Sequence, residues 1–169
     1  MQEYDWRKEE AKINELPQFK TAIELQDFGV FDIHFVHATS DVEGAVPLLF
    51  LHGWPVYFLE VRKLVKPLLA AGFDVVALSH PVFGFLSYTD HQGLKFFHFA
   101  DIHHKLMLRL GYDNYAVQGG DVGSLVGRAM ALRYPDHAKA LHLNIVRDIS
   151  LPVSPSSCFP YRLLTNPSS

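Results

Sequence analysis

The spacing of hydrophobic and polar residues predicts a series of strands in the middle of the chain. Residues 30–37 alternate between apolar and polar side chains, which is typical of a strand with one buried face. Residues 47–51, with the sequence PLLFL, form a short continuous apolar run, as expected for a strand buried on both faces of a parallel sheet. Further strands are predicted at residues 73–78, 115–118 and 140–146.

Helices are predicted in the intervals between these strands. They cover residues 58–70, residues 97–110, and the segment from the turn at 119–124 to about Tyr134. In the second of them, apolar side chains and His103 recur on one face at helical spacing. Strands that alternate with helices favour a doubly wound α/β fold with a mostly parallel sheet, here of four or five strands.

The two ends of the chain lack this alternation. Asp5 can cap a short helix, and we interpret residues 1–29 as an N-terminal arm. Residues 148–169 are rich in serine and proline and show no periodicity, so we interpret them as a tail. The predicted core is therefore residues 30–147, and the exposed edge of its last strand, at 140–146, is a candidate for self-association.

Composition narrows the classes of function. The 169 residues, of which 49% are hydrophobic and 20% are charged, suit one globular domain. A net charge of -3 argues against nucleic acid as a partner. The single cysteine, Cys158, excludes an internal disulfide and favours a reducing, cytoplasmic location. No apolar run approaches the ~18 residues that a transmembrane helix needs.

A glycine-rich turn supplies the strongest chemical signal. Gly119-Gly120-Asp121-Val122-Gly123 lies between a predicted strand and a predicted helix, which is the pattern of a nucleophile elbow with aspartate as the nucleophile. Such a turn is tight, so a β-carbon two positions before or after the nucleophile would clash. Asp121 is therefore expected above the carboxyl edge of the sheet, ionised at a helix N-terminus. The alternative is that Asp121 only caps this helix.

A second turn is predicted at the same edge of the sheet. His52-Gly53-Trp54-Pro55 directly follows the strand at residues 47–51. Backbone N–H groups of this turn and of Val122 would together form an oxyanion hole for a tetrahedral intermediate. The alternative interpretation of this motif is a turn that buries a tryptophan.

These motifs resemble the epoxide hydrolases of the α/β-hydrolase fold, in particular the microsomal-type branch that is common in fungi. The resemblance rests on the HGWP turn, the aromatic loop 81–85 (PVFGF) and the turn 119–124 (GGDVGS). It implies that Asp121 attacks a small apolar epoxide to form an alkyl ester, and that the amides of Trp54 and Val122 form the oxyanion hole. No cofactor is implied, and no histidine spacing suggests a metal site.

The two turns and the aromatic loop also provide candidates for the substrate pocket: His52, Pro55, His80, Phe83 and Phe85. His80 is unusual at its position, and it could act as an improvised base beside Asp121. Val56 and Val82 stand where the family commonly has glycine. Because a β-branched residue resists positive φ, both turns are expected to differ in shape from those of the family.

The resemblance also shows what the sequence is expected to lack. In the family, the acid, the histidine base and the cap tyrosines follow well after the nucleophile. Here only His137 and His142 follow Asp121, and we interpret them as ordinary loop and strand residues, while Asp148 has no histidine to orient. The cap and the C-terminal half of the fold are thus expected to be absent, and the chain to be weak or inactive. The alternatives are a non-catalytic form that associates with a partner chain, and a hydrolase of the haloalkane dehalogenase type.

Overall fold

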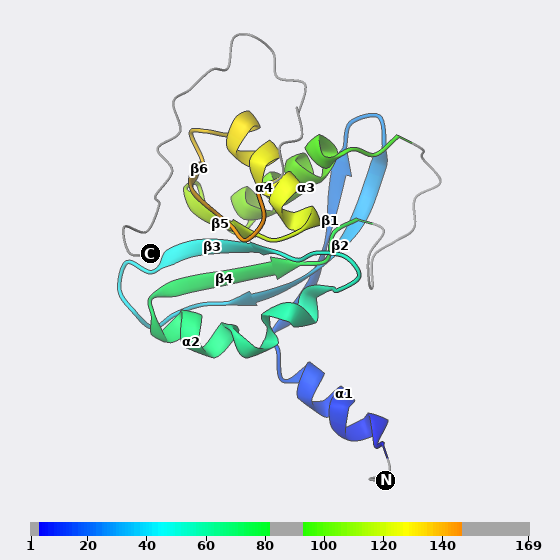
Figure 1. Cartoon of the computed structure of the whole chain (residues 1–169), viewed down its shortest axis with the longest axis vertical. Helices are drawn as coiled ribbons and strands as arrows, with labels where there is room; N and C mark the ends of the chain where they lie inside the picture. Colours follow the sequence, from blue (N-terminus) through cyan, green and yellow to red (C-terminus); the bar gives the residue numbers. More distant parts are fainter. Residues whose placement is uncertain (1–3, 82–92, 147–169) are drawn as a thin grey trace.

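Six strands of the described residues form one sheet in the order β1-β2-β4-β3-β5-β6 (Figure 1). The computed structural model describes residues 4–81 and 93–146. The strands β4, β3, β5 and β6 are parallel, whereas β1 and β2 form an antiparallel hairpin that joins β4 through β2. The predicted α/β fold with a mostly parallel sheet is confirmed. The strands are β1 (Gln18–Leu25), β2 (Gly29–Ala38), β3 (Val46–Leu51), β4 (Phe73–Leu78), β5 (Tyr115–Gly119) and β6 (Ala138–Leu143).

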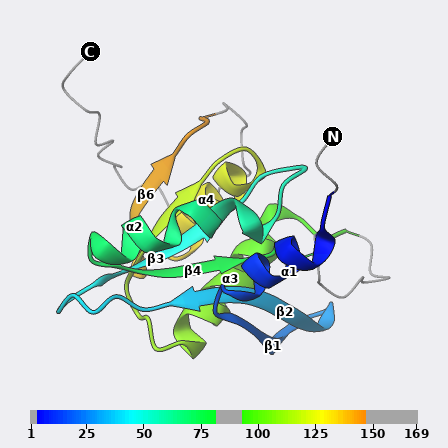
Figure 2. The ribbon, with the colours of Figure 1, turned by 90° about the horizontal axis from the view of Figure 1, so that it is seen from below.

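Helices cover both faces of this sheet. The 3-10 helix η1 (Phe58–Lys63) and α2 (Val65–Ala70) lie on one face, and α3 (Phe96–Arg109) and α4 (Val122–Arg133) lie on the other (Figure 1). The N-terminal helix α1 (Trp6–Asn14) lies on the same side as α2 (Figure 2). None of the helices within the described residues combines the length and the apolar character that a membrane span requires.

The hydrophobic core is divided by the sheet into two clusters. Leu49 and Leu51 of β3 pack under α3 and α4, whereas Phe50 faces the cluster under η1 and α2. All three side chains are buried, so the prediction that this strand is covered on both faces is confirmed. Because β3 is paired on both sides, with β4 and with β5, the residues that follow it are held on a rigid support.

The described residues form six strands, whereas four or five were predicted, and the additional strand is β1. Strand β1 lies in the segment that we interpreted as an arm, and it pairs along its whole length with β2. Only Ile23 and Leu25 of β1 are buried, so its hydrophobic alternation is weak. The turn between the strands contains Asp27, with a φ of 68°, and β2 begins at Gly29, with a φ of 80°. These two residues are the local signal for a hairpin.

Two predicted elements differ in their bounds. The helix predicted at 58–70 is divided into η1 and α2. Pro67 explains the break, because in a continuous α-helix its ring would collide with the carbonyl group of Lys63. The last strand, predicted at 140–146, begins and ends earlier, because it pairs with β5 and the pairing stops at Gly119. The predicted tail at 148–169 lies outside the described residues.

Candidate active site

The chain turns sharply from β5 into α4 at Asp121. This residue has a φ of 47° and a ψ of −118°, a backbone conformation that residues other than glycine seldom adopt. Its carboxylate makes no capping hydrogen bond to α4. The alternative that Asp121 is only a helix cap is therefore wrong, and the strained turn directs its side chain elsewhere.

The glycines on either side of this turn allow two backbone segments to approach closely. A β-carbon on Gly119 would overlap the carbonyl oxygen of Gly123, and a β-carbon on Gly123 would overlap that of Leu51. The predicted clash two positions before and after Asp121 is confirmed. The start of α4 thus packs directly on the end of β3, and the two turns lie side by side.

The Asp121 carboxylate meets the turn that follows β3. The backbone N–H of Trp54 donates a hydrogen bond of 2.8 Å to Asp121 Oδ2. The Trp54 side chain is 69% exposed, so the alternative of a turn that buries this tryptophan is wrong. The Trp54-Pro55 peptide bond is cis, and Pro55 is exposed. The amide that the resemblance assigns to an oxyanion hole is therefore in contact with the carboxylate.

A second backbone donor directly follows Asp121 in the chain. Val122 is the first residue of α4 and directly follows Asp121. Within residues 4–81 and 93–146, no group accepts a hydrogen bond from the Val122 N–H. This N–H belongs to the first turn of a helix, where unpaired donors and the helix dipole favour negative charge. The site thus combines one carboxylate with two amide donors at the carboxyl ends of β3 and β5.

Behind the turn lie three buried histidines, His52, His80 and His103. The ring Nδ1 of His80 lies 2.9 Å from Nε2 of His103, and its Nε2 lies 2.8 Å from the carbonyl oxygen of His52. Burial lowers the pKa of His52, burial and the neighbouring imidazoles lower that of His80 well below its usual range, and burial lowers the pKa of His103 to about 3. All three rings are consequently neutral. No three metal-ligating side chains of the described residues are arranged to hold a metal ion.

Of the remaining candidates for the site, two histidines lie within the described residues and the two phenylalanines do not. His80 and His52 lie beneath the turn, and no described hydrogen bond joins His80 to Asp121. The aromatic candidates Phe83 and Phe85, together with Val82 and Asp148, lie outside the described residues.

Val56 lies within the described part of the chain, as do His137 and His142, the two histidines that follow Asp121 in the sequence. Among its residues other than glycine, positive φ occurs only at Asp27 and Asp121, so Val56 does not require it. His137 contacts Asp113, which precedes β5, and therefore lies at the opposite end of that strand from the carboxylate. His142 is exposed on β6.

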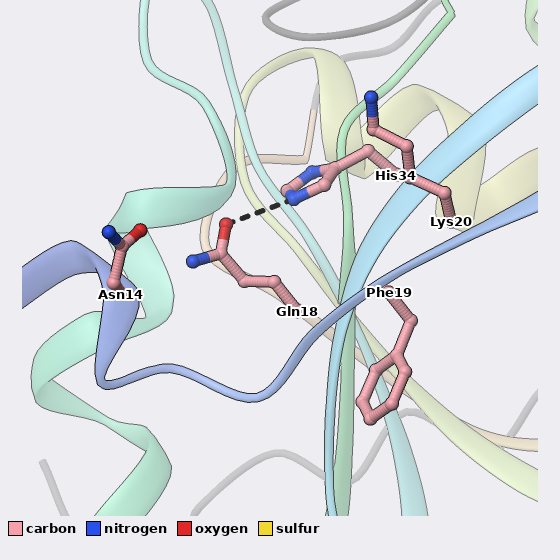
Figure 3. A pocket seen from close by; sticks show the side chains of 5 residues that line it. All are labelled: Asn14, Gln18, Phe19, Lys20 and His34. Carbon is pink, nitrogen blue, oxygen red and sulfur yellow. Dashed lines mark hydrogen bonds between the residues drawn. The ribbon is translucent and has the colours of Figure 1, made fainter.

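A surface cavity of about 340 Å³ opens elsewhere, between α1 and the β1–β2 hairpin (Figure 3). In it, His34 Nε2 lies 3.0 Å from Gln18 Oε1. None of the residues predicted for the active site lines this cavity, which is bounded by Asn14, Gln18, Phe19, Lys20 and His34.

Sequence reasoning missed two residues of this region. A β-carbon on Gly53 would lie 2.9 Å from Cβ of Asp121, so this position needs glycine, and its place directly after a strand-ending histidine was the available signal. His103 was interpreted as a core residue of its helix, and it is buried as expected. Its bond to His80 has no sequence signal, because the two residues are 23 positions apart on different elements.

The chain belongs to the α/β-hydrolase fold family, since residues 46–168 match the family described as alpha/beta hydrolase fold. Within that fold it is a member of the epoxide hydrolases. Residues 1–61 match the family described as epoxide hydrolase N terminus, which includes α1, β1 and β2.

Individual relatives agree with this assignment. The chain is 40% identical over 156 residues to Epoxide hydrolase 1 of Sus scrofa. This match covers 84% of this chain and 33% of the relative. The epoxide hydrolase of Aspergillus niger superimposes with a TM-score of 0.76 at 35% identity, covering 92% of this chain and 41% of that one. The juvenile hormone epoxide hydrolase of Bombyx mori superimposes with a TM-score of 0.77 at 36% identity, covering 85% of this chain and 39% of that one. The chain thus spans about a third of the length of the curated relatives it matches.

Proposed function

We propose that this chain provides the nucleophile and the oxyanion hole of an epoxide hydrolase, with Asp121 as the nucleophile. The observation that carries the proposal is the hydrogen bond of 2.8 Å from the Trp54 N–H to Asp121 Oδ2, at a turn whose conformation is otherwise unfavourable. An ordinary helix cap would need neither feature. The similarity to epoxide hydrolases supports the same chemistry.

In the first step, the Asp121 oxygen that does not accept the Trp54 hydrogen bond attacks a carbon of the epoxide. A carbon–oxygen bond forms to the carboxylate and the ring carbon–oxygen bond breaks. The electron pair passes to the epoxide oxygen, which takes up a proton from solvent water and becomes a hydroxyl group. The product is a hydroxyalkyl ester of Asp121.

In the second step, water attacks the ester carbonyl and the oxygen held by Trp54 becomes an oxyanion. The amides of Trp54 and Val122 stabilise this charge, the diol leaves, and the carboxylate is restored. Water needs a general base, and no imidazole of the described residues is hydrogen-bonded to Asp121. General acid or base assistance is worth roughly 100- to 10,000-fold in rate, so we propose that the 169-residue chain forms the ester and hydrolyses it slowly or not at all.

The experiment is intact-mass spectrometry of the chain after incubation with styrene oxide, followed by peptide mapping. We expect one added epoxide on Asp121, and none in Asp121→Asn, which keeps an oxygen to accept from Trp54. Asp27→Asn is the matched control, because Asp27 is an exposed aspartate that also has a positive φ. This control should be alkylated as fast as the unaltered chain.

Other outcomes would redirect the assignment. Alkylation that persists in Asp121→Asn would remove Asp121 as the nucleophile. Release of halide from a haloalkane, in place of epoxide capture, would favour the dehalogenase alternative. Turnover of styrene oxide to its diol by the chain would show that water activation does not require a further residue.

A second candidate function, self-association, is favoured by the exposure of β6. Among residues 4–81 and 93–146, this strand pairs with β5 only, and its burial is slight along its whole length. Leu141, Ile145 and Val146 in and after it are at least 36% exposed. We propose that a second copy of the chain adds to this edge, because unpaired strand edges invite further strands. Sedimentation velocity over a range of concentrations tests the proposal, and a monomer at every concentration would refute it.

We also propose that the chain is located in the cytoplasm. The presence of one cysteine in 169 residues supports a reducing, cytoplasmic compartment. Fractionation of cells that produce the tagged chain would test it, and recovery with secreted proteins would overturn it.

A further inference from the structure

The buried histidines behind the active site form a hydrogen-bonded chain whose proton positions can be deduced. The His52 carbonyl oxygen can only accept, so His80 Nε2, 2.8 Å away, carries the proton. A neutral His80 then accepts at Nδ1, so His103 Nε2 is the donor across 2.9 Å. The backbone N–H of His80 donates to Nε2 of His52 over 3.0 Å, which leaves the His52 proton on Nδ1, 2.9 Å from the Gly53 carbonyl oxygen.

This chain of bonds fixes the peptide units that lead to Trp54. His80 holds His52 twice, once through its ring and once through its backbone N–H. The next residue, Gly53, lies against the Asp121 side chain, and the residue after it donates to the carboxylate. The His80 imidazole thus holds the chain at His52, two residues before Trp54, whose N–H is the oxyanion donor.

The burial of these rings is complete, which makes polar side chains costly there. His80 and His103 are 0% exposed, and within the described residues Nδ1 of His103 makes no hydrogen bond of good geometry. The Phe99 backbone interacts with this ring, but burial outweighs it and lowers the pKa of His103. A buried polar atom is costly, and at position 103 the hydrogen bond to His80 offsets part of this cost, which an apolar side chain could not do. Packing alone therefore does not account for a histidine at position 103.

We propose that His80 and His103 are positioning residues that hold the 52–54 turn so that the Trp54 amide stays on the Asp121 carboxylate. His80 supplies the bond to the turn, and His103 fixes the tautomer of His80 that can donate it. The inference rests on the proposed function for its catalytic consequence, but the geometry can be measured without any reaction.

The test compares His80→Gln with His80→Leu in the 15N-labelled 169-residue chain. Glutamine can still donate to the His52 carbonyl group, whereas leucine cannot. We expect the Trp54 amide proton to move upfield and to exchange with solvent about tenfold faster or more in His80→Leu, and to be nearly unchanged in His80→Gln. Imidazole 15N shifts should show the proton on Nε2 of His80 and His103 and on Nδ1 of His52.

A kinetic measurement separates positioning from general stability. With styrene oxide as the probe, His80→Leu should be alkylated roughly 10- to 100-fold more slowly at saturating epoxide. The epoxide concentration that gives half the maximal rate should be unchanged, and the rate should recover in His80→Gln. His103→Leu should slow alkylation, because it removes the donor that fixes the tautomer of His80, while the melting temperature should change little because the buried space stays filled. An unchanged Trp54 amide in folded His80→Leu, or a proton on Nδ1 of His103, would overturn the inference. A normal amide response in a chain that styrene oxide never alkylates would instead refute only the proposed function.

Discussion

The α-carbon of Gly53 faces the side chain of Asp121 so closely that a β-carbon there would lie 2.9 Å from Asp121 Cβ and 3.1 Å from Oδ2. The turn after β3 therefore determines where the carboxylate can stand. This contact joins residues that are far apart in sequence, and it is made possible by the pairing of β3 with β5.

Gly53→Ala should displace the carboxylate without unfolding the chain. We expect overpacking to cost about 1–3 kcal/mol in the free energy of unfolding. Because the carboxylate must move away from the Trp54 amide, alkylation by styrene oxide should slow by about 100-fold. Urea unfolding and intact-mass kinetics measure the two effects. Alkylation at the original rate would show that the side chain adapts freely.

Gly119 and Gly120 are adjacent, yet alanine should have very different effects at the two positions. A β-carbon on Gly119 meets the backbone of Gly123, which cannot move aside, so Gly119→Ala should destabilise by about 3 kcal/mol or more. On Gly120 the nearest atom is Asn144 Nδ2 at 3.4 Å, the end of an exposed side chain, so Gly120→Ala should cost less than about 1 kcal/mol. Equal losses in urea unfolding would contradict the backbone clash.

The conformation of Asp121 should be visible as stored strain. Asp121→Gly and Asp121→Ala both remove the carboxylate, but only glycine tolerates a φ of 47° with a ψ of −118°. The glycine variant should therefore be more stable than the alanine variant by about 1–2 kcal/mol, although alanine is ordinarily the better residue near a helix start. Calorimetry of the pair decides the matter, and a more stable alanine variant would indicate an unstrained turn.

Acid should destabilise the fold through the buried histidines. Burial lowers the pKa of His103 from 6.5 to about 3, so this ring is neutral in the folded chain and takes up a proton only on unfolding. Its contribution to stability is present above pH 6.5 and is lost as the pH falls from there towards 3. The slope for one such histidine is about 1.4 kcal/mol per pH unit. Unfolding free energies at several pH values should show a shallower slope in His103→Leu, and an identical slope would exclude a neutral His103.

Much of the fold could be predicted because its central strands carry clear patterns. The predicted and observed bounds of β4 agree at 73–78, and the continuous apolar run at 47–51 marks a strand covered on both faces. Strand β1 was missed since only two of its side chains are buried, and its pairing with β2 is made by backbone hydrogen bonds of a hairpin, which leave little hydrophobic pattern in the sequence. The helix predicted at 58–70 failed at one proline, whose effect depends on the carbonyl group four residues earlier.

The candidate site was predictable as far as local sequence and sheet topology reach. Parallel strands bring their carboxyl ends to one edge, which was enough to expect Trp54 and Asp121 near each other. The contact of His80 with His103 was beyond that reasoning. It joins a strand end to the middle of a helix, and only the packing of α3 on the sheet brings the two rings together.

The strand order β4-β3-β5 has a kinetic consequence for the site. Trp54 and Asp121 are 67 residues apart, and they meet only when β5 pairs with β3. Contacts of such high sequence separation form late and slowly, because a long loop must close before they yield any gain. During refolding, the ability to be alkylated should appear after the far-ultraviolet circular dichroism of the secondary structure has recovered, so reactivity would mark completed assembly of the sheet.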